Sequence, residues 1–104
     1  MSAPPYRLTP APEYNEVIAK LKRKPGENAT KLKKINKTLG LLRDHGPGHP
    51  SLNAHKYDSM PEVIPGKPVW EVYVENNTPN AWRLFYCHGP EADMLTIITV
   101  WPHP

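Results

Sequence analysis

Two side chains near the end of the chain, Arg83 and His103, have types and positions that suit chemistry on a phosphate. Arg83 lies within a β-prone apolar run, residues 82–87, and His103 lies between two prolines just after a second run, residues 94–101. A Gly-Pro turn separates the runs, so the pattern predicts a hairpin that brings both side chains together. A guanidinium binds phosphate oxygens with paired hydrogen bonds, and an imidazole exchanges protons near neutral pH.

The first element expected to support this hairpin is an amphipathic helix. Thr9 is predicted to be its N-cap and Pro10 to occupy its first position. The Pro25-Gly26 pair is predicted to end it. Its apolar stripe, at positions i, i+3, i+4 and i+7, consists of Tyr14, Val17, Ile18 and Leu21.

A second helix is expected to follow after a short link, which makes the two an antiparallel helical hairpin. Asn28 or Thr30 is its predicted cap, and Gly46-Pro47 is its predicted end. Its buried face is expected to consist of Leu32, Ile35, Leu39 and Leu42. A cluster of basic side chains surrounds the tip of the hairpin: Lys20, Lys22, Arg23, Lys24, Lys31, Lys33, Lys34 and Lys37.

The second half of the chain has the period of β-strands. Residues 45–68 are rich in proline and glycine and are predicted to be a long loop. Apolar residues then alternate with polar ones from Val69, and the segments 82–87 and 94–101 complete a three-stranded meander. Residues 1–12 are expected to be an extended arm, and the pattern allows an extra strand near residues 6–8. The prediction is one α+β domain, residues 1–104, with an N-terminal helical hairpin packed on a small antiparallel β-sheet.

Strand alternation gives a prediction for the side-chain directions in the segment 82–87. If Trp82, Leu84 and Tyr86 face the helices, then Arg83 and the residues two and four positions after it face the opposite side. A phosphate contact is one role for an arginine there. The alternative is a salt bridge to Glu71 or Glu75 on the neighbouring strand.

The charge of the chain is unevenly distributed, although its net value is only +3. Residues 1–60 hold eleven lysines and arginines against five acidic residues, whereas residues 61–104 hold two against five. A basic half favours a polyanion or an acidic protein as partner, and solvated lysine-rich helix faces are the alternative.

Other sequence features limit the class of protein. The single cysteine, Cys87, excludes an internal disulfide and fits a reducing cytoplasm. No run is apolar enough for a membrane span, and the first residues do not have the pattern of a signal peptide. The histidines match no zinc-binding spacing and no Gly-rich phosphate loop precedes a helix, so no metal or cofactor is expected.

Several segments, taken in order, resemble the RelE/ParE superfamily of bacterial toxins from toxin–antitoxin pairs. The resemblance rests on residues 49–56 (HPSLNAHK), 70–74 (WEVYV), 82–86 (WRLFY) and the closing Pro102-His103. Leu52 and His55 match a leucine–x–x–histidine pattern, and residues 83–86 match an arginine–aliphatic–apolar–tyrosine strand. The chain departs from the family in carrying Glu71 and Glu75, where active members place basic residues.

This resemblance implies a RelE-like fold and a metal-independent endoribonuclease that cleaves messenger RNA, with the ribosome as the expected location. It implies that Arg83, His103 and His55 are catalytic and that Lys56 binds substrate. Tyr73 is a candidate for stacking a base or assisting proton transfer, and the basic helices, with Lys31 and Lys34, are expected to hold RNA. The implied partners are a cognate antitoxin and the ribosome, and a homodimer or a toxin–antitoxin hetero-oligomer is the expected assembly.

Two alternatives remain beside the ribonuclease. One is a non-enzymatic member of the same fold, either a gyrase-directed toxin or a nucleic-acid-binding or protein-binding module. The other is a plain α+β interaction protein with solvated lysines. Salt dependence separates the last from the others, because phosphate contacts weaken as salt rises.

Overall fold

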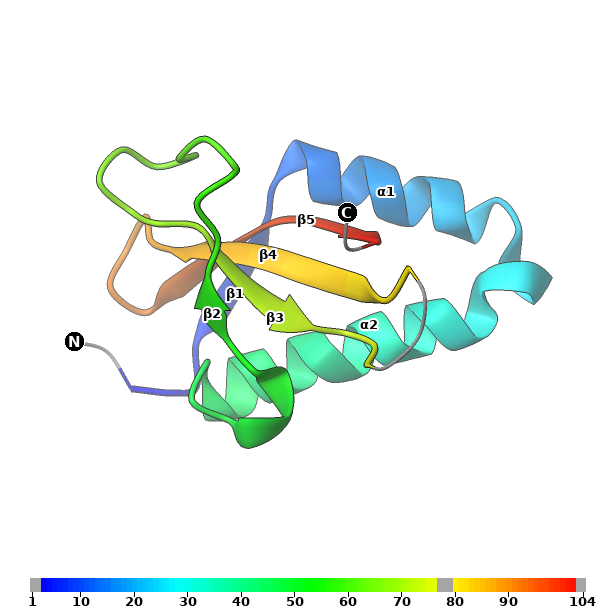
Figure 1. The fold of residues 1–104 in the computed structure, drawn as a ribbon, viewed down its shortest axis with the longest axis horizontal. Coiled ribbons are helices and arrows are strands. Elements are labelled where there is room, and N and C mark those ends of the chain that lie inside the picture. The colour runs from blue at the N-terminus through cyan, green and yellow to red at the C-terminus, as the bar shows by residue number, and fades with distance from the viewer. Residues whose placement is uncertain (1–2, 77–79, 103–104) are drawn as a thin grey trace.

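A five-stranded sheet and a pair of helices packed on one of its faces make up the computed structural model, which describes residues 3–76 and 80–102 (Figure 1). The strand order is β1-β5-β4-β3-β2. In chain order the elements are β1 (Arg7–Pro10), α1 (Pro12–Lys22), α2 (Pro25–His45), the short 3-10 helix η1 (Pro50–Leu52), β2 (His55–Lys56), β3 (Trp70–Tyr73), β4 (Trp82–His88) and β5 (Met94–Pro102).

The predicted antiparallel meander is present as β3, β4 and β5, and the α+β class is confirmed. The additional strand near residues 6–8 is β1, which pairs with β5 in parallel, with Arg7 opposite Met94. The sheet is therefore mixed rather than purely antiparallel. The predicted loop of residues 45–68 contains η1 and β2, and β2 adds to the free edge of β3.

Each helix begins at a proline, but neither begins where it was predicted to begin. Thr9 and Pro10 belong to β1, so α1 begins at Pro12 with Ala11 as its N-cap. Pro25 is the first residue of α2 rather than the end of α1, because a proline fits the first helical turn, where its missing N–H costs nothing. The predicted caps Asn28 and Thr30 therefore lie inside α2. Within the described residues, no helix is long and apolar enough to cross a membrane.

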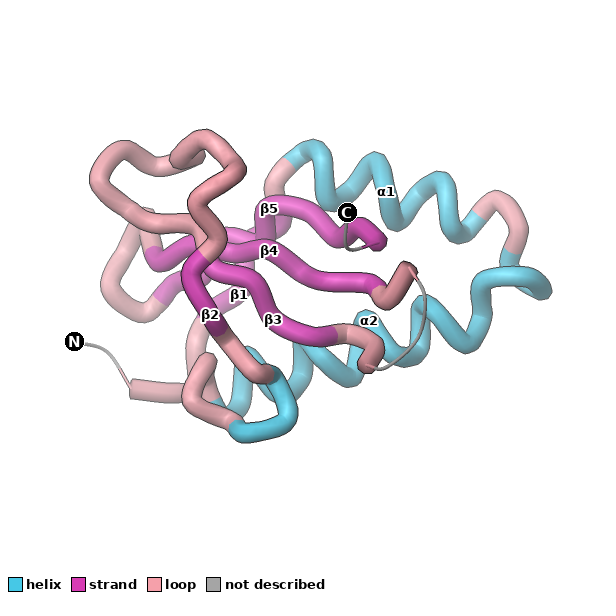
Figure 2. The backbone as a smooth tube through the Cα atoms, in the orientation of Figure 1, coloured by secondary structure: helices cyan, strands magenta, loops and turns pink. Residues whose placement is uncertain are grey.

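The sheet has two different faces. On its inner face, Leu84, Tyr86 and Val100 join the apolar stripes of α1 and α2 in the main core. On its outer face, Phe85 and Cys87 join a smaller core under the loop that leads from β2 to β3, residues 57–69. Figure 2 shows this loop at the end of the sheet away from the turn between the helices. The predicted alternation along β4 is thus confirmed, and the loop covers only part of the outer face.

Candidate functional site

Two neighbouring rows of side chains cross the outer face, and the strand register defines them. The strands β2, β3, β4 and β5 pair in this order, and the register sets each residue opposite one residue of the next strand. Paired residues project from the same face of the sheet. The first row is His55, Glu71, Phe85 and Thr99. The second row is Tyr73, Arg83 and Trp101.

Arg83 lies at the centre of the second row and is only 8% exposed. The plane of its guanidinium stacks on the Tyr73 ring, 3.7 Å from the ring centroid, and Nη1 donates a 2.8 Å hydrogen bond to the Glu75 carbonyl. Its Nε lies 3.4 Å from Glu71 Oε1, so the salt bridge weighed as an alternative for this arginine is present. Among the described residues, none accepts a hydrogen bond from Nη2.

Glu71 is a buried carboxylate between two basic side chains. It is 1% exposed, and its Oε1 lies 3.4 Å from Arg83 Nε and 3.2 Å from His55 Nε2. Because β3 is flanked by β4 and β2, one carboxylate can contact a residue from each neighbour. From the sequence, Glu71 was one of two possible salt-bridge partners of Arg83. Its contact with His55 was not predicted, because the two-residue strand β2 has no recognisable period.

His55 is oriented by a backbone carbonyl. Its Nδ1 lies 2.9 Å from the Asn53 carbonyl oxygen, which can only accept, so Nδ1 carries a proton and donates it. This leaves Nε2 directed at the Glu71 carboxylate, while the ring edge contacts Tyr73 with centroids 6.0 Å apart. The imidazole is half exposed. The imidazole can therefore exchange a proton with the Glu71 carboxylate at Nε2.

A bulge at the end of β3 separates the second glutamate from this cluster. The N–H groups of Val74 and Glu75 both donate to the Trp82 carbonyl, at 3.1 and 3.2 Å. Two residues thus oppose one, which interrupts the alternation and turns Glu75 toward α2 instead of the outer face.

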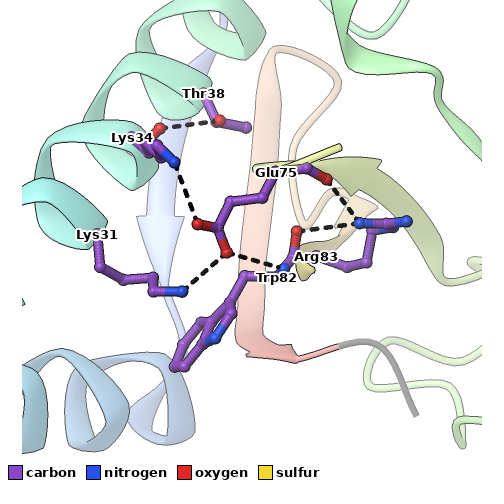
Figure 3. A network of polar contacts seen from close by, with 6 residues as sticks. All are labelled: Lys31, Lys34, Thr38, Glu75, Trp82 and Arg83. Carbon is purple, nitrogen blue, oxygen red and sulfur yellow. Dashed lines mark hydrogen bonds and ion pairs between the residues drawn. The ribbon is translucent and has the colours of Figure 1, made fainter. Parts of the chain in front are cut away.

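Figure 3 shows what Glu75 contacts on that side. Lys31 and Lys34 of α2 lie 2.8 and 3.2 Å from its two carboxylate oxygens, and the Trp82 N–H donates at 3.2 Å. Burial alone would raise the pKa of Glu75, but the hydrogen bonds from Lys31, Trp82 and Lys34 together hold that pKa below its usual value. Lys31 and Lys34 are thus paired with a carboxylate on the inner side, away from Arg83.

The remaining predicted site residues have different positions. Lys56 is opposite Trp70, so it projects from the other face than His55, and it lies 3.8 Å from Asp58 in an exposed ion pair. His103 lies outside the described residues. Of the seven predicted site residues, the structure brings three together: Arg83, His55 and Tyr73.

A groove of about 300 Å³ leads away from this cluster between α2, η1 and the end of β3. Tyr73 lines this groove, and Arg83 lies over its ring, so the groove adjoins the cluster. Lys34, Lys37, Ser51 and Asn76 supply polar and basic groups to its walls. An extended polyanion that reached Arg83 could continue along this groove.

Comparisons with known proteins concern the fold. No protein-family model and no curated protein matches the chain. Two solved structures are similar to it. One is an archaeal RelE–RelB complex from Pyrococcus horikoshii OT3, with 10% identity, a TM-score of 0.61 and 94% of each chain covered. The other is the YoeB dimer from Staphylococcus aureus, with 18% identity, a TM-score of 0.63, and 96% of this chain and 99% of that chain covered. The chain therefore has the RelE-like fold that the order of its sequence motifs predicted.

Proposed function

We propose that the chain is the toxin of a toxin–antitoxin pair and a metal-independent endoribonuclease that cleaves messenger RNA on the ribosome. The observation that carries the proposal is the cluster of Arg83, Glu71, His55 and Tyr73 on the outer face. It combines a phosphate-binding cation with two groups that exchange protons, and these are the requirements for cleaving RNA without a metal.

The reaction begins with the ribose 2′-OH, which attacks the adjacent phosphorus. The bond from O2′ to phosphorus forms while the bond to the 5′ oxygen of the next nucleotide breaks, which leaves a 2′,3′-cyclic phosphate and a 5′-hydroxyl. Glu71 takes the 2′-OH proton, and His55 Nε2, 3.2 Å from Glu71 Oε1, can then accept it. Arg83 holds a phosphoryl oxygen with its Nη2. His103, by resemblance to the family, donates the proton to the leaving oxygen.

Substrate and partner contacts extend from this centre. RNA on either side of the scissile phosphate follows the groove past Tyr73 and Lys37. The exposed lysines of α1 and α2 contact ribosomal RNA, and Lys56 adds positive charge near β2. The RelE–RelB complex and the YoeB dimer support a cognate antitoxin as partner and a dimer as a further assembly. The proposed location is the cytoplasm.

Cleavage of ribosome-bound messenger tests this function. Purified protein is added to ribosomes programmed with a defined messenger, with and without EDTA, and the ends of the products are identified. We expect cyclic phosphate and 5′-hydroxyl ends in both conditions, and Arg83→Ala should lower the rate about 100- to 1,000-fold. Lys67→Ala, which removes an exposed cation from the loop between β2 and β3, is the control and should cleave normally. Intact messenger with folded protein would overturn the proposal.

A non-enzymatic toxin or binding module is the second candidate, and one observation favours it. Glu71 already neutralises Arg83 in a buried pair, which is a sufficient structural reason for both residues. This candidate predicts growth arrest on expression with intact messenger, and gyrase inhibition would identify the gyrase-directed form. It also predicts that His55→Ala still arrests growth.

A further inference from the structure

Trp101 is an exposed aromatic side chain next to the proposed catalytic arginine. It is 43% exposed, whereas the other two tryptophans are partly buried against the main core. An indole left in water forgoes the burial that stabilises most tryptophans in folded proteins. In this small domain, the position of such a side chain calls for an explanation.

The register places Trp101 beside Arg83. The two residues are directly opposite in β5 and β4, so their side chains project from the same face with Cβ atoms about 5 Å apart. Tyr73 is the partner of Arg83 on the other side and stacks on its guanidinium. The arginine is thus flanked by two aromatic residues, one of which already contacts it.

The indole of Trp101 is held in place at its edge. Nε1–H donates a 3.2 Å hydrogen bond to Glu13 Oε2 in the first turn of α1. This bond uses the only polar group of the indole, so only the apolar faces of the ring remain to contact a ligand.

Several other aromatic rings near the sheet already have ring or cation partners. Lys31 lies over the Trp82 ring, Tyr57 packs on Phe85, and Arg83 lies on Tyr73. In the described part of the chain, no ring or cation packs on Trp101. Part of the ring surface is exposed, so a planar ligand can pack on it.

We infer that Trp101 is a stacking platform for the nucleobase next to the phosphate that Arg83 holds. This inference rests on the proposed ribonuclease function and adds a residue that selects and positions the substrate. Nucleobases stack on aromatic side chains in single-stranded RNA recognition. The base attached to the reacting ribose lies one sugar away from the scissile phosphate, and Trp101 lies one strand away from Arg83.

Binding to a messenger that cannot be cleaved tests the platform separately from catalysis. The probe is a short messenger in the ribosomal decoding site with a 2′-O-methyl group at each ribose of the codon, so the attacking hydroxyl is absent. Trp101→Ala should weaken binding about 10-fold or more, because loss of a stacked base has an effect of this size. Trp101→Phe keeps an aromatic face and should retain most of the affinity. Val63→Ala removes the other exposed large apolar side chain and should leave binding unchanged.

An abasic scan of the codon identifies the stacked base. Removing one particular base should weaken binding of the parent protein by the same factor as Trp101→Ala, and combining the two changes should have no further effect. If the loss of affinity from Trp101→Ala adds to the loss from every abasic position, the platform is overturned. It is also overturned if folded Trp101→Ala binds RNA as the parent does and has lost affinity only for an antitoxin. If the platform is present but unmodified messenger is never cleaved, the proposed function fails and the stacking inference stands as RNA recognition alone.

Discussion

Glu71 and Glu75 lie four residues apart at the end of one strand, yet they have opposite environments. Glu71 is almost fully buried on the outer face, against one guanidinium and one imidazole. Glu75 reaches the inner side, where its side chain is 14% exposed and two lysines of α2 hold it. The first contacts the arginine of the proposed catalytic cluster, and the second ties a helix to the sheet. Identical side chains in one short segment thus have different partners.

The largest expected effect that separates the two is on catalysis. Glu71→Gln keeps the shape of the side chain but removes its ability to accept a proton, so the rate of messenger cleavage should fall about 100- to 10,000-fold. Glu75→Gln is the matched control and should retain most of the activity, because its backbone carbonyl still binds Arg83. The measurement is single-turnover cleavage on programmed ribosomes. Equal losses in the two variants would remove the distinction.

The second effect concerns the free energy of unfolding. Arg83→Met leaves the buried Glu71 without its guanidinium and should lower the stability by about 3 kcal/mol. Combining it with Glu71→Leu should recover much of this loss, because apolar side chains can replace a buried ion pair. Urea denaturation of the two single variants and the double variant measures this difference. A double variant less stable than either single one would mean that the pair itself stabilises the fold.

The corresponding change at Glu75 should be smaller. Glu75→Ala removes the acceptor for two lysines and one backbone N–H and should lower the stability by about 1 kcal/mol, because the contacts are partly exposed. A double-mutant cycle with Lys31→Met isolates the ion pair. Lys33→Met is the control, since this lysine is exposed on the same helix. A coupling as large as that of the buried pair would contradict the assigned difference in burial.

The smallest effect is a dependence of stability on pH. The pKa of Glu75 in the folded protein lies below its usual value. The contribution of the Glu75 charge to the free energy of unfolding is therefore complete above the usual pKa, and it is lost as the pH falls through the lowered folded pKa. Urea midpoints measured between about pH 6 and pH 3 should therefore converge for the parent and Glu75→Gln at the acidic end. Parallel curves would show that the charge of Glu75 does not contribute.

The sequence was sufficient to predict the fold class because the periods of its apolar residues change clearly from helix to strand. The alternation along β4 also placed Arg83 on the outer face correctly. Helix starts were less predictable, because Pro12 and Pro25 can each begin a helix or follow one. The two-residue strand β2 is too short to have a recognisable period.

The candidate site was partly predictable for a related reason. Arg83, Tyr73 and His55 meet because the strand register brings them together, and their residue types drew attention beforehand. The pairing of Lys31 and Lys34 with Glu75 was not predicted, because nothing in the sequence indicated the bulge that directs Glu75 to them. Glu71 was named beforehand as a possible salt-bridge partner of Arg83, but its burial between a guanidinium and an imidazole depends on tertiary packing.

The bulge at Val74 and Glu75 has a consequence for natural variation in this chain. Deleting one residue at this point would restore the strict alternation of β3 and would exchange the environments of the side chains that follow it. A length change of one residue at this bulge should therefore perturb the site more than a change of two.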